Sequence, residues 1–192
     1  MRLFVAVDLD EPRRLAAAQA AASIARRLDA AGVGRSLKWV DPRNLHLTLR
    51  FIGEVDDERG SVIRDALGRP LSTPAFDLTL GGAGVFPPSG NPRVLWLGVV
   101  QGASELAGLH DEIEGRLRAM GESPDTRPFS SHLTLARFKD LDRARSESVR
   151  AAIREARLDP GPCRVEAVTL YQSRLAPAGP TYTALLRSPL AR

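Results

Sequence analysis

The sequence predicts an α+β protein with two lobes, mainly antiparallel sheets and a central cleft. Helical and β-type patterns are mixed without the regular alternation of a doubly wound parallel sheet. The order of elements in the first half of the chain also returns in the second half. The chain has 192 residues, 43% of them hydrophobic, which is enough for a core. We therefore expect a single domain, 1–192, with pseudo-twofold-related lobes of about residues 1–90 and 91–192.

The first half predicts strands at 3–7, 36–40, 45–51 and 76–86 and helices from 11 to before Gly32 and at 56–67. Pro12 suits the first turn of the long helix, and glycines from Gly32 onward end it. Residues 45–51 alternate between apolar and polar side chains, as a half-buried strand does. The run of Pro, Ser, Gly and Asn at 87–92 is the strongest loop signal, and we expect the junction between the lobes there.

The second half repeats this order, with strands at 94–100, 132–138, 163–171 and 182–186 and helices at 104–120 and 142–157. The first of these helices has apolar residues three and four positions apart, which gives it one core-facing side. Each half thus contains strand, helix, strand, helix and strand in the same order.

The composition restricts the possible functions less than it restricts the possible folds. The net charge of +4 and the pI near 9.9 favour a polyanionic partner only weakly. Cys163 is the single cysteine, so an internal disulfide and a cysteine-based zinc site are excluded. The apolar runs are too short to span a bilayer, and an acidic residue comes too early for a secretory signal. We expect a cytoplasmic protein with no membrane partner and no obligatory protein partner.

The four-residue motif His-Leu-Thr-Leu occurs twice, at 46–49 and at 132–135. Side chains alternate along a strand, so His46 and Thr48 share one face while the leucines anchor the other in the core. His132 and Thr134 are presented in the same way. Two lobes related by a twofold axis would bring both pairs into one cleft. Either motif alone is explained by ordinary strand composition, but its repetition at equivalent places in the two halves favours a functional site.

Two imidazoles and two hydroxyls on one surface suit acid–base chemistry on a phosphate. A neutral imidazole takes a proton from water, and a protonated one gives a proton to a leaving oxygen. Threonine hydroxyls donate hydrogen bonds to phosphoryl oxygens. A metal site would need a third ligand, and neither motif supplies one, so no metal is predicted. His110 lies in a helical pattern and is interpreted as a surface residue.

Strand parity also bears on two arginines. Arg50 has the parity of His46, so it is a candidate for contact with the phosphate of a substrate. Arg137 has the opposite parity from His132 and is a candidate only if the strand ends or bulges first.

The sequence around the two motifs resembles that of a known family. The matching segments are 2–7, 44–55, 84–87, 92–99, 132–137, 171–175 and 179–182. With these segments the chain resembles the two-histidine (2H) phosphoesterases, and among them the bacterial and archaeal RNA 2′,3′-cyclic phosphodiesterases, also called 2′-5′ RNA ligases. In that family proline commonly precedes the second histidine, whereas Ser131 stands there in this sequence.

The resemblance implies a bilobal fold whose cleft is lined by both motifs. It implies hydrolysis of an RNA 2′,3′-cyclic phosphate to a 2′-phosphate without a metal or other cofactor. His46 would be the proton donor and His132 the proton acceptor, while Thr48 and Thr134 would hold the phosphate. The expected partners are RNA ends, with tRNA as one candidate, or cyclic nucleotides.

Three alternatives stay open at this point. A ligase would run the same chemistry backwards, with a 5′-hydroxyl in place of water. A small cyclic nucleotide is another substrate that the same four residues would suit. A non-catalytic RNA-binding module is an alternative from another class, although a mere binder would be free to lose these residues.

Overall fold

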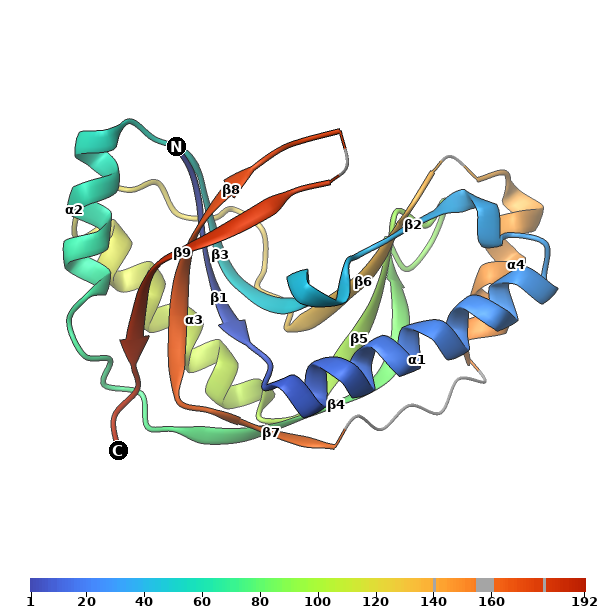
Figure 1. Cartoon of the computed structure of the whole chain (residues 1–192), viewed down its shortest axis with the longest axis horizontal. Coiled ribbons are helices and arrows are strands. Elements are labelled where there is room, and N and C mark those ends of the chain that lie inside the picture. Colours follow the sequence, from blue (N-terminus) through green and yellow to red (C-terminus); the bar gives the residue numbers. More distant parts are fainter. Residues whose placement is uncertain (140, 155–160, 178) are drawn as a thin grey trace.

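The computed structural model describes residues 1–139, 141–154, 161–177 and 179–192. These residues form an α+β structure with four α-helices and one curled, antiparallel sheet, which confirms the predicted class (Figure 1). The strands are β1 (Arg2–Asp8), β2 (Leu37–Trp39), β3 (His46–Glu54), β4 (Phe76–Phe86), β5 (Val94–Gln101), β6 (His132–Phe138), β7 (Pro162–Val165), β8 (Ala167–Arg174) and β9 (Thr181–Pro189). The helices are α1 (Glu11–Ala30), α2 (Asp57–Leu67), α3 (Ala103–Arg118) and α4 (Arg143–Arg154).

The strand order has a pseudo-twofold symmetry centred on β3 and β6. The sheet runs β7-β4-β5-β6-β3-β1-β8-β9, with β2 added along β6. Outward from the centre, β6, β5, β4 and β7 on one side correspond to β3, β1, β8 and β9 on the other. β4 comes from the first half of the sequence but lies beside β5, and β8 comes from the second half but lies beside β1. Each half of the sheet therefore takes strands from both repeats. A boundary near residue 90 in the sequence would cut through both halves of the sheet.

The helices cover one face of the sheet and leave the other for the site. The buried core joins the inward leucines of β3 and β6, Leu47 and Leu133 among them, to helix residues such as Ile24 and Leu109. Helix α1 packs with α4, and α2 with α3, at opposite ends of the molecule (Figure 1). None of the helices in the described part of the chain combines the length and the apolar character that crossing a membrane requires.

Local signals account for the helix ends. The Asp10 carboxylate accepts a hydrogen bond from the Arg13 backbone at 2.8 Å, and Pro12 stands in the first turn of α1, as predicted. Helix α4 spans Arg143–Arg154 where 142–157 was expected, and the last three of those residues lie outside the described ones.

The prediction of one strand at 163–171 is wrong. The segment is divided at Glu166 into β7, which pairs with β4 at one edge, and β8, which pairs with β1 in the other half of the sheet. Burial alternates along β7, whereas the first four residues of β8 are all buried. The two pieces differ because β7 lies at the edge of the sheet and β8 lies between β1 and β9.

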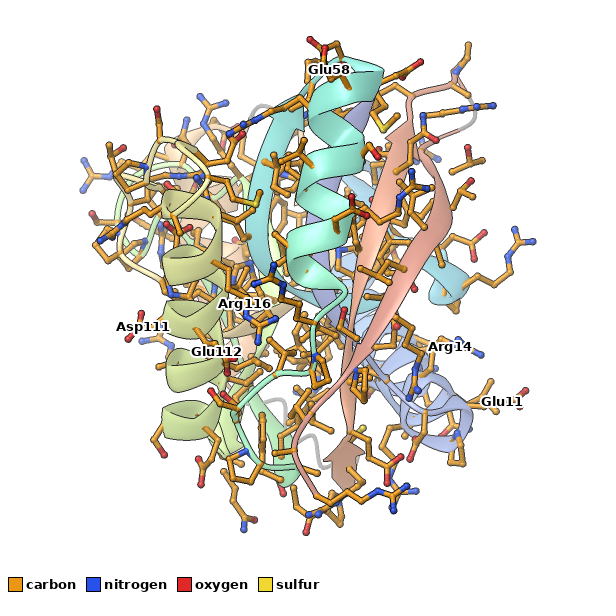
Figure 2. All side chains as sticks on the ribbon, turned by 90° about the vertical axis from the view of Figure 1, so that its left-hand side faces the viewer. Glu11, Arg14, Glu58, Asp111, Glu112 and Arg116 are labelled. Atoms are coloured by element: carbon orange, nitrogen blue, oxygen red, sulfur yellow. The ribbon has the colours of Figure 1, made fainter. Side chains whose placement is uncertain are left out.

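Polar contacts fasten α3 to the segment that follows α2. Glu112 accepts hydrogen bonds from the backbone of Ser72 and Thr73 at 2.8 and 3.0 Å. Burial tends to raise the pKa of Glu112, but these hydrogen bonds outweigh it and lower the pKa to about 2. Arg116 lies one turn along the helix from Glu112 (Figure 2). Its guanidinium donates a hydrogen bond to the carbonyl of Arg69 at 2.6 Å. The helix is thereby held against the first repeat, where it meets β3.

Candidate active site

The two motif strands meet at the centre of the sheet. Leu47 of β3 is paired with Leu133 of β6 in antiparallel register. On either side of this pair, the register sets His46 opposite Thr134 and Thr48 opposite His132. The two leucines are buried in the core, so all four polar side chains share the opposite face, where they are half-buried. The structure therefore brings together the four residues that the repeated motif indicated.

Both imidazole rings are oriented by the backbone two residues earlier. Nδ1 of His46 lies 2.8 Å from the carbonyl of Asn44, and Nδ1 of His132 lies 2.7 Å from the carbonyl of Ser130. A carbonyl only accepts, so Nδ1 carries a proton in each ring and Nε2 is the nitrogen that exchanges a proton. The Thr48 hydroxyl lies 3.1 Å from Nε2 of His46. The Nδ1 contact of His132 thus matches that of His46, with Ser131 between the ring and the carbonyl that it contacts.

Burial lowers the pKa of both histidines, but their charged neighbours differ. For His46 the carbonyl that binds Nδ1 and the carboxylate of Asp8 raise the pKa against this effect, and His132 lowers it. For His132 the carbonyl again raises the pKa, whereas the guanidinium of Arg137 lowers it further. His46 thus has an anionic neighbour and His132 a cationic one.

The alternation expected along β3 ends after Thr48. The register between β3 and β1 skips Leu49, which is the extra residue of a β-bulge. Leu49 and Arg50 are consequently both buried on the helix side, and Phe51 returns to the face of His46. The expectation that Arg50 shares the face of His46 is therefore wrong, because parity reverses at a bulge.

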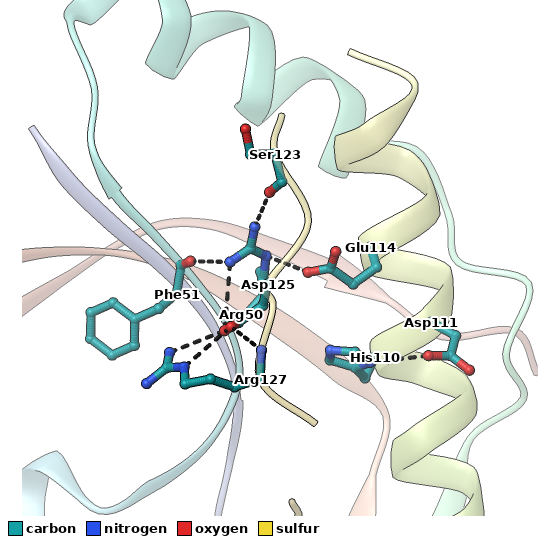
Figure 3. A network of polar contacts seen from close by, with 8 residues as sticks. All are labelled: Arg50, Phe51, His110, Asp111, Glu114, Ser123, Asp125 and Arg127. Atoms are coloured by element: carbon teal, nitrogen blue, oxygen red, sulfur yellow. Dashed lines mark hydrogen bonds and ion pairs between the residues drawn. The ribbon is translucent and has the colours of Figure 1, made fainter. Parts of the chain in front are cut away.

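Arg50 instead joins β3 to α3 and to the segment that leads into β6. It forms an ion pair with Glu114, and the two side chains are only 10% and 7% exposed (Figure 3). The guanidinium also donates to the carbonyls of Phe51 and Ser123, at 2.6 and 2.5 Å, and lies 3.8 Å from Asp125. These contacts give Arg50 a structural role beneath the site.

A matching bulge brings Arg137 to the site face. The register between β6 and β5 skips Leu135, so Leu135 and Ala136 are both buried. Arg137 is exposed, and its charge acts on both His132 and Tyr182. The bulge is the condition under which the sequence allowed Arg137 a place beside its histidine. In the pseudo-twofold arrangement, Arg137 occupies the position that Phe51 has in the other half.

Aromatic rings surround His46 on the same face. The Phe4 ring lies 4.9 Å from the His46 ring and packs between the rings of Phe51, Tyr171 and Tyr182. Sequence reasoning missed both tyrosines as site residues. They are the two tyrosines of the chain, and each stands in a segment that carries the family resemblance, which was the available signal.

Asp8 was also missed. It is the Cα partner of His46 across β1 and β3, on the face that Phe4 and Ala6 share. Its carboxylate accepts hydrogen bonds from the hydroxyls of Thr169 and Tyr171, at 2.6 and 2.7 Å. The alternation of the first strand places Asp8 with Phe4, but only the pairing of β1 with β3 brings it to His46.

Other features of the structure lie apart from these residues. A cavity of about 580 Å³ lies between the 88–91 loop and α4, and one of about 200 Å³ lies along α3. Neither is lined by the four motif residues, which stand on an open face. Within the ranges that the structure describes, no three His, Cys, Asp or Glu side chains are grouped so as to hold a metal ion.

The chain is similar to proteins of known family along most of its length. The family model described as the 2′-5′ RNA ligase superfamily matches residues 13–176. A relative from Aeropyrum pernix, named RNA 2′,3′-cyclic phosphodiesterase, is 38% identical over 155 residues, 81% of this chain and 87% of that protein. The crystal structure of TT0787 of Thermus thermophilus has a TM-score of 0.78 and 31% identity, covering 98% of this chain and 97% of that one. That of E. coli LigT complexed with 3′-AMP has a TM-score of 0.71 and 30% identity, covering 100% and 98%.

Proposed function

The chain belongs to the 2′-5′ RNA ligase superfamily, and on this premise we propose that it hydrolyses the 2′,3′-cyclic phosphate at RNA ends to a 2′-phosphate. The observation that carries the proposal is the meeting of both His/Thr pairs on one face, across the Leu47–Leu133 pair. Curated relatives named RNA 2′,3′-cyclic phosphodiesterase support the substrate class. We also propose RNA ends as the substrate, with tRNA among the candidates, and the cytoplasm as the location of the activity.

In the proposed mechanism the two histidines act on opposite sides of the phosphorus. Nε2 of His132 accepts a proton from water as the water oxygen forms a bond to phosphorus. The bond between phosphorus and the 3′-oxygen breaks, and Nε2 of His46 donates a proton to that oxygen. The product has a 2′-phosphate and a 3′-hydroxyl, and proton exchange with solvent restores both rings. No metal takes part in these steps.

The direction of proton transfer follows from family likeness and agrees with the charges nearby. The base must be neutral before reaction, and Arg137 disfavours a charged His132. The acid must be charged, and the carboxylate of Asp8 favours a charged His46. The two rings are otherwise held in the same way, so their charged neighbours distinguish them.

Thr48, Thr134 and Arg137 bind the phosphate in this proposal. The register sets each threonine beside the histidine of the other motif, so the two hydroxyls flank the point where a phosphorus between the rings would lie. Arg137 adds a cation on the same face, where a guanidinium can bind two phosphate oxygens at once. Hydrogen bonds of this kind strengthen as negative charge grows on the phosphoryl oxygens.

The test is a product analysis on an oligoribonucleotide that ends in a 2′,3′-cyclic phosphate. We expect the intact protein to release a 2′-phosphate end, identified by ³¹P NMR and by resistance to a 3′-specific phosphatase. His46→Ala and His132→Ala should each reduce the rate by about 10²–10⁴-fold. A 3′-phosphate product, or unchanged rates in both variants, would contradict the proposal.

Ligation is the second candidate, and the description of the family as 2′-5′ RNA ligases favours it. The same residues would then deprotonate a 5′-hydroxyl instead of water. Supplying a 5′-hydroxyl RNA together with the cyclic phosphate end separates the two directions by the ratio of joined to hydrolysed product. Running the assay beside a cyclic mononucleotide tests whether the RNA chain contributes to recognition.

A further inference from the structure

The pseudo-twofold symmetry of the site is broken beside the histidines. On β1 the Cα partner of His46 is Asp8, whereas on β5 the Cα partner of His132 is Gly98. The two partners occupy equivalent places in the two halves of the sheet. One histidine therefore has a carboxylate across the strand pair, and the other has a residue without a side chain.

The carboxylate of Asp8 is held in place from the next strand. The hydroxyl of Thr169 donates to one carboxylate oxygen and the hydroxyl of Tyr171 to the other, at 2.6 and 2.7 Å. Thr169 is only 3% exposed, so at least one of the two donors is fixed in the sheet. Burial and the bond to Asp8 both raise the pKa of Tyr171, which keeps its hydroxyl a donor at neutral pH.

The groups that face His46 come from several strands. Asp8 lies on β1, the rings of Tyr171 and Tyr182 come from β8 and β9, and His132 lies on β6. Asp8 provides the negative charge in this set, while a protonated His132 would oppose a proton on His46. Both tyrosines have a raised pKa and are neutral at neutral pH.

We propose that Asp8 is a positioning residue that makes His46 the acid of the pair, by holding a fixed carboxylate beside its ring. The inference rests on the proposed function for its catalytic meaning, but its physical content concerns only the protonation of His46. It also explains why two rings with the same backbone contacts take different roles. Thr169 and Tyr171 act one step further away, by keeping the carboxylate where its charge favours protonated His46.

The direct test is an NMR titration of the histidine rings in the free protein. The chain has three histidines, so substituting each in turn assigns their signals. Asp8→Asn should lower the pKa of His46 by about half a unit to one unit, because Asp8 is exposed and solvent weakens its charge. The pKa of His132 should change less. At about 1 M salt, where the Debye length is about 3 Å, the effect should shrink.

The matched control is Asp111→Asn. Asp111 is an exposed carboxylate on α3, 3.1 Å from Nδ1 of His110 (Figure 3), and it is not among the groups that shift the pKa of His46. The substitution changes the net charge by the same amount, so the pKa of His46 and the hydrolysis rate should stay as in the unmodified protein. Tyr171→Phe retains the carboxylate and removes one of its donors, and should shift His46 in the same direction by less.

The kinetic test follows kcat/KM against pH. The acid must be protonated, so the alkaline limb reports His46, and Asp8→Asn should move that limb to lower pH by the shift that NMR measures. Asp8→Glu should restore part of it. An unchanged His46 titration in Asp8→Asn overturns the inference, as does a loss of activity without any shift. If both histidine variants retain full activity, the proposed function fails while the titration still decides the role of Asp8.

Discussion

Leu47 and Leu133 are paired at the point where the two halves of the sheet meet, and the pseudo-twofold relation between the histidine motifs is centred on them. Both are at most 2% exposed, so this contact anchors the core side of each motif strand. The polar residues next to each leucine face the other way. The same packing that joins the halves therefore sets the spacing of the two imidazoles.

Removing either threonine hydroxyl should weaken catalysis without unfolding the protein. Thr48 and Thr134 are half-buried on the open face, so Thr48→Ala and Thr134→Ala leave no cavity in the core. A lost hydrogen bond to a charged phosphate costs about 1.5–3 kcal/mol, or roughly tenfold to more than a hundredfold in rate. Rates and thermal unfolding of both variants and of the double variant check this. Turnover at the original rate in the double variant would show that the hydroxyls do not contact the phosphate.

The two arginines should respond to substitution in opposite ways. Arg137→Ala should reduce kcat/KM by about tenfold or more, because an exposed cation beside the phosphate is lost. The free energy of unfolding should stay within about 0.5 kcal/mol of its original value. Steady-state kinetics and denaturant unfolding of one protein sample measure both quantities. A stability loss equal to that of an Arg50 variant would show that Arg137 has a structural role and contradict its assignment to phosphate binding.

Arg50→Met should instead reduce stability by about 3–5 kcal/mol, because Glu114 is left as a buried charge without its partner. Replacing both residues, as Arg50→Met with Glu114→Leu, should recover much of that loss. Denaturant unfolding of the two variants measures the difference. Equal stability of the single and double variants would mean that the ion pair is not what the single substitution disturbs.

The pH dependence of kcat/KM should be a bell. The base must be neutral, so activity rises as His132 loses its proton, and the acid must be charged, so activity falls as His46 loses its own. Burial lowers the pKa of both rings, which places the maximum below the ordinary histidine value of about 6.5. A pH series on a cyclic nucleotide measures it. A maximum well above pH 7 is incompatible with two buried histidines as the titrating pair.

The roles of the two histidines should separate with a modified leaving group. A substrate with sulfur in place of the bridging 3′-oxygen departs as a thiolate, which needs no proton because thiols have a pKa near 8.5. This substrate should rescue His46→Ala but not His132→Ala. The reverse pattern would exchange the two roles, and equal rescue of both variants would remove the division of labour altogether.

Hydrolysis should continue in the presence of a chelator. The proposed steps move protons between water, two imidazoles and the 3′-oxygen, and none of them uses a metal ion. We expect the same rate before and after dialysis against excess EDTA. Loss of activity in EDTA that a single divalent metal restores would rule out the proposed mechanism.

Most of the site could be predicted from the chain itself because its parts are local and repeated. Alternation along a strand puts a histidine and a threonine two residues apart on one face, and leucines between them in the core. The appearance of this pattern at both His46 and His132 indicated two symmetry-related His/Thr pairs that form one site. Neither inference requires knowing which strands are neighbours.

The remaining features depend on pairing between distant strands. The bulges at Leu49 and Leu135 arise where β3 and β6 carry one residue more than β1 and β5, so they bury Arg50 and bring Arg137 to the site. Asp8 reaches His46 only because β1 is paired with β3. Side-chain period is a property of one strand, whereas register is a property of two, and the backbone hydrogen bonds that set register form only when the sheet assembles.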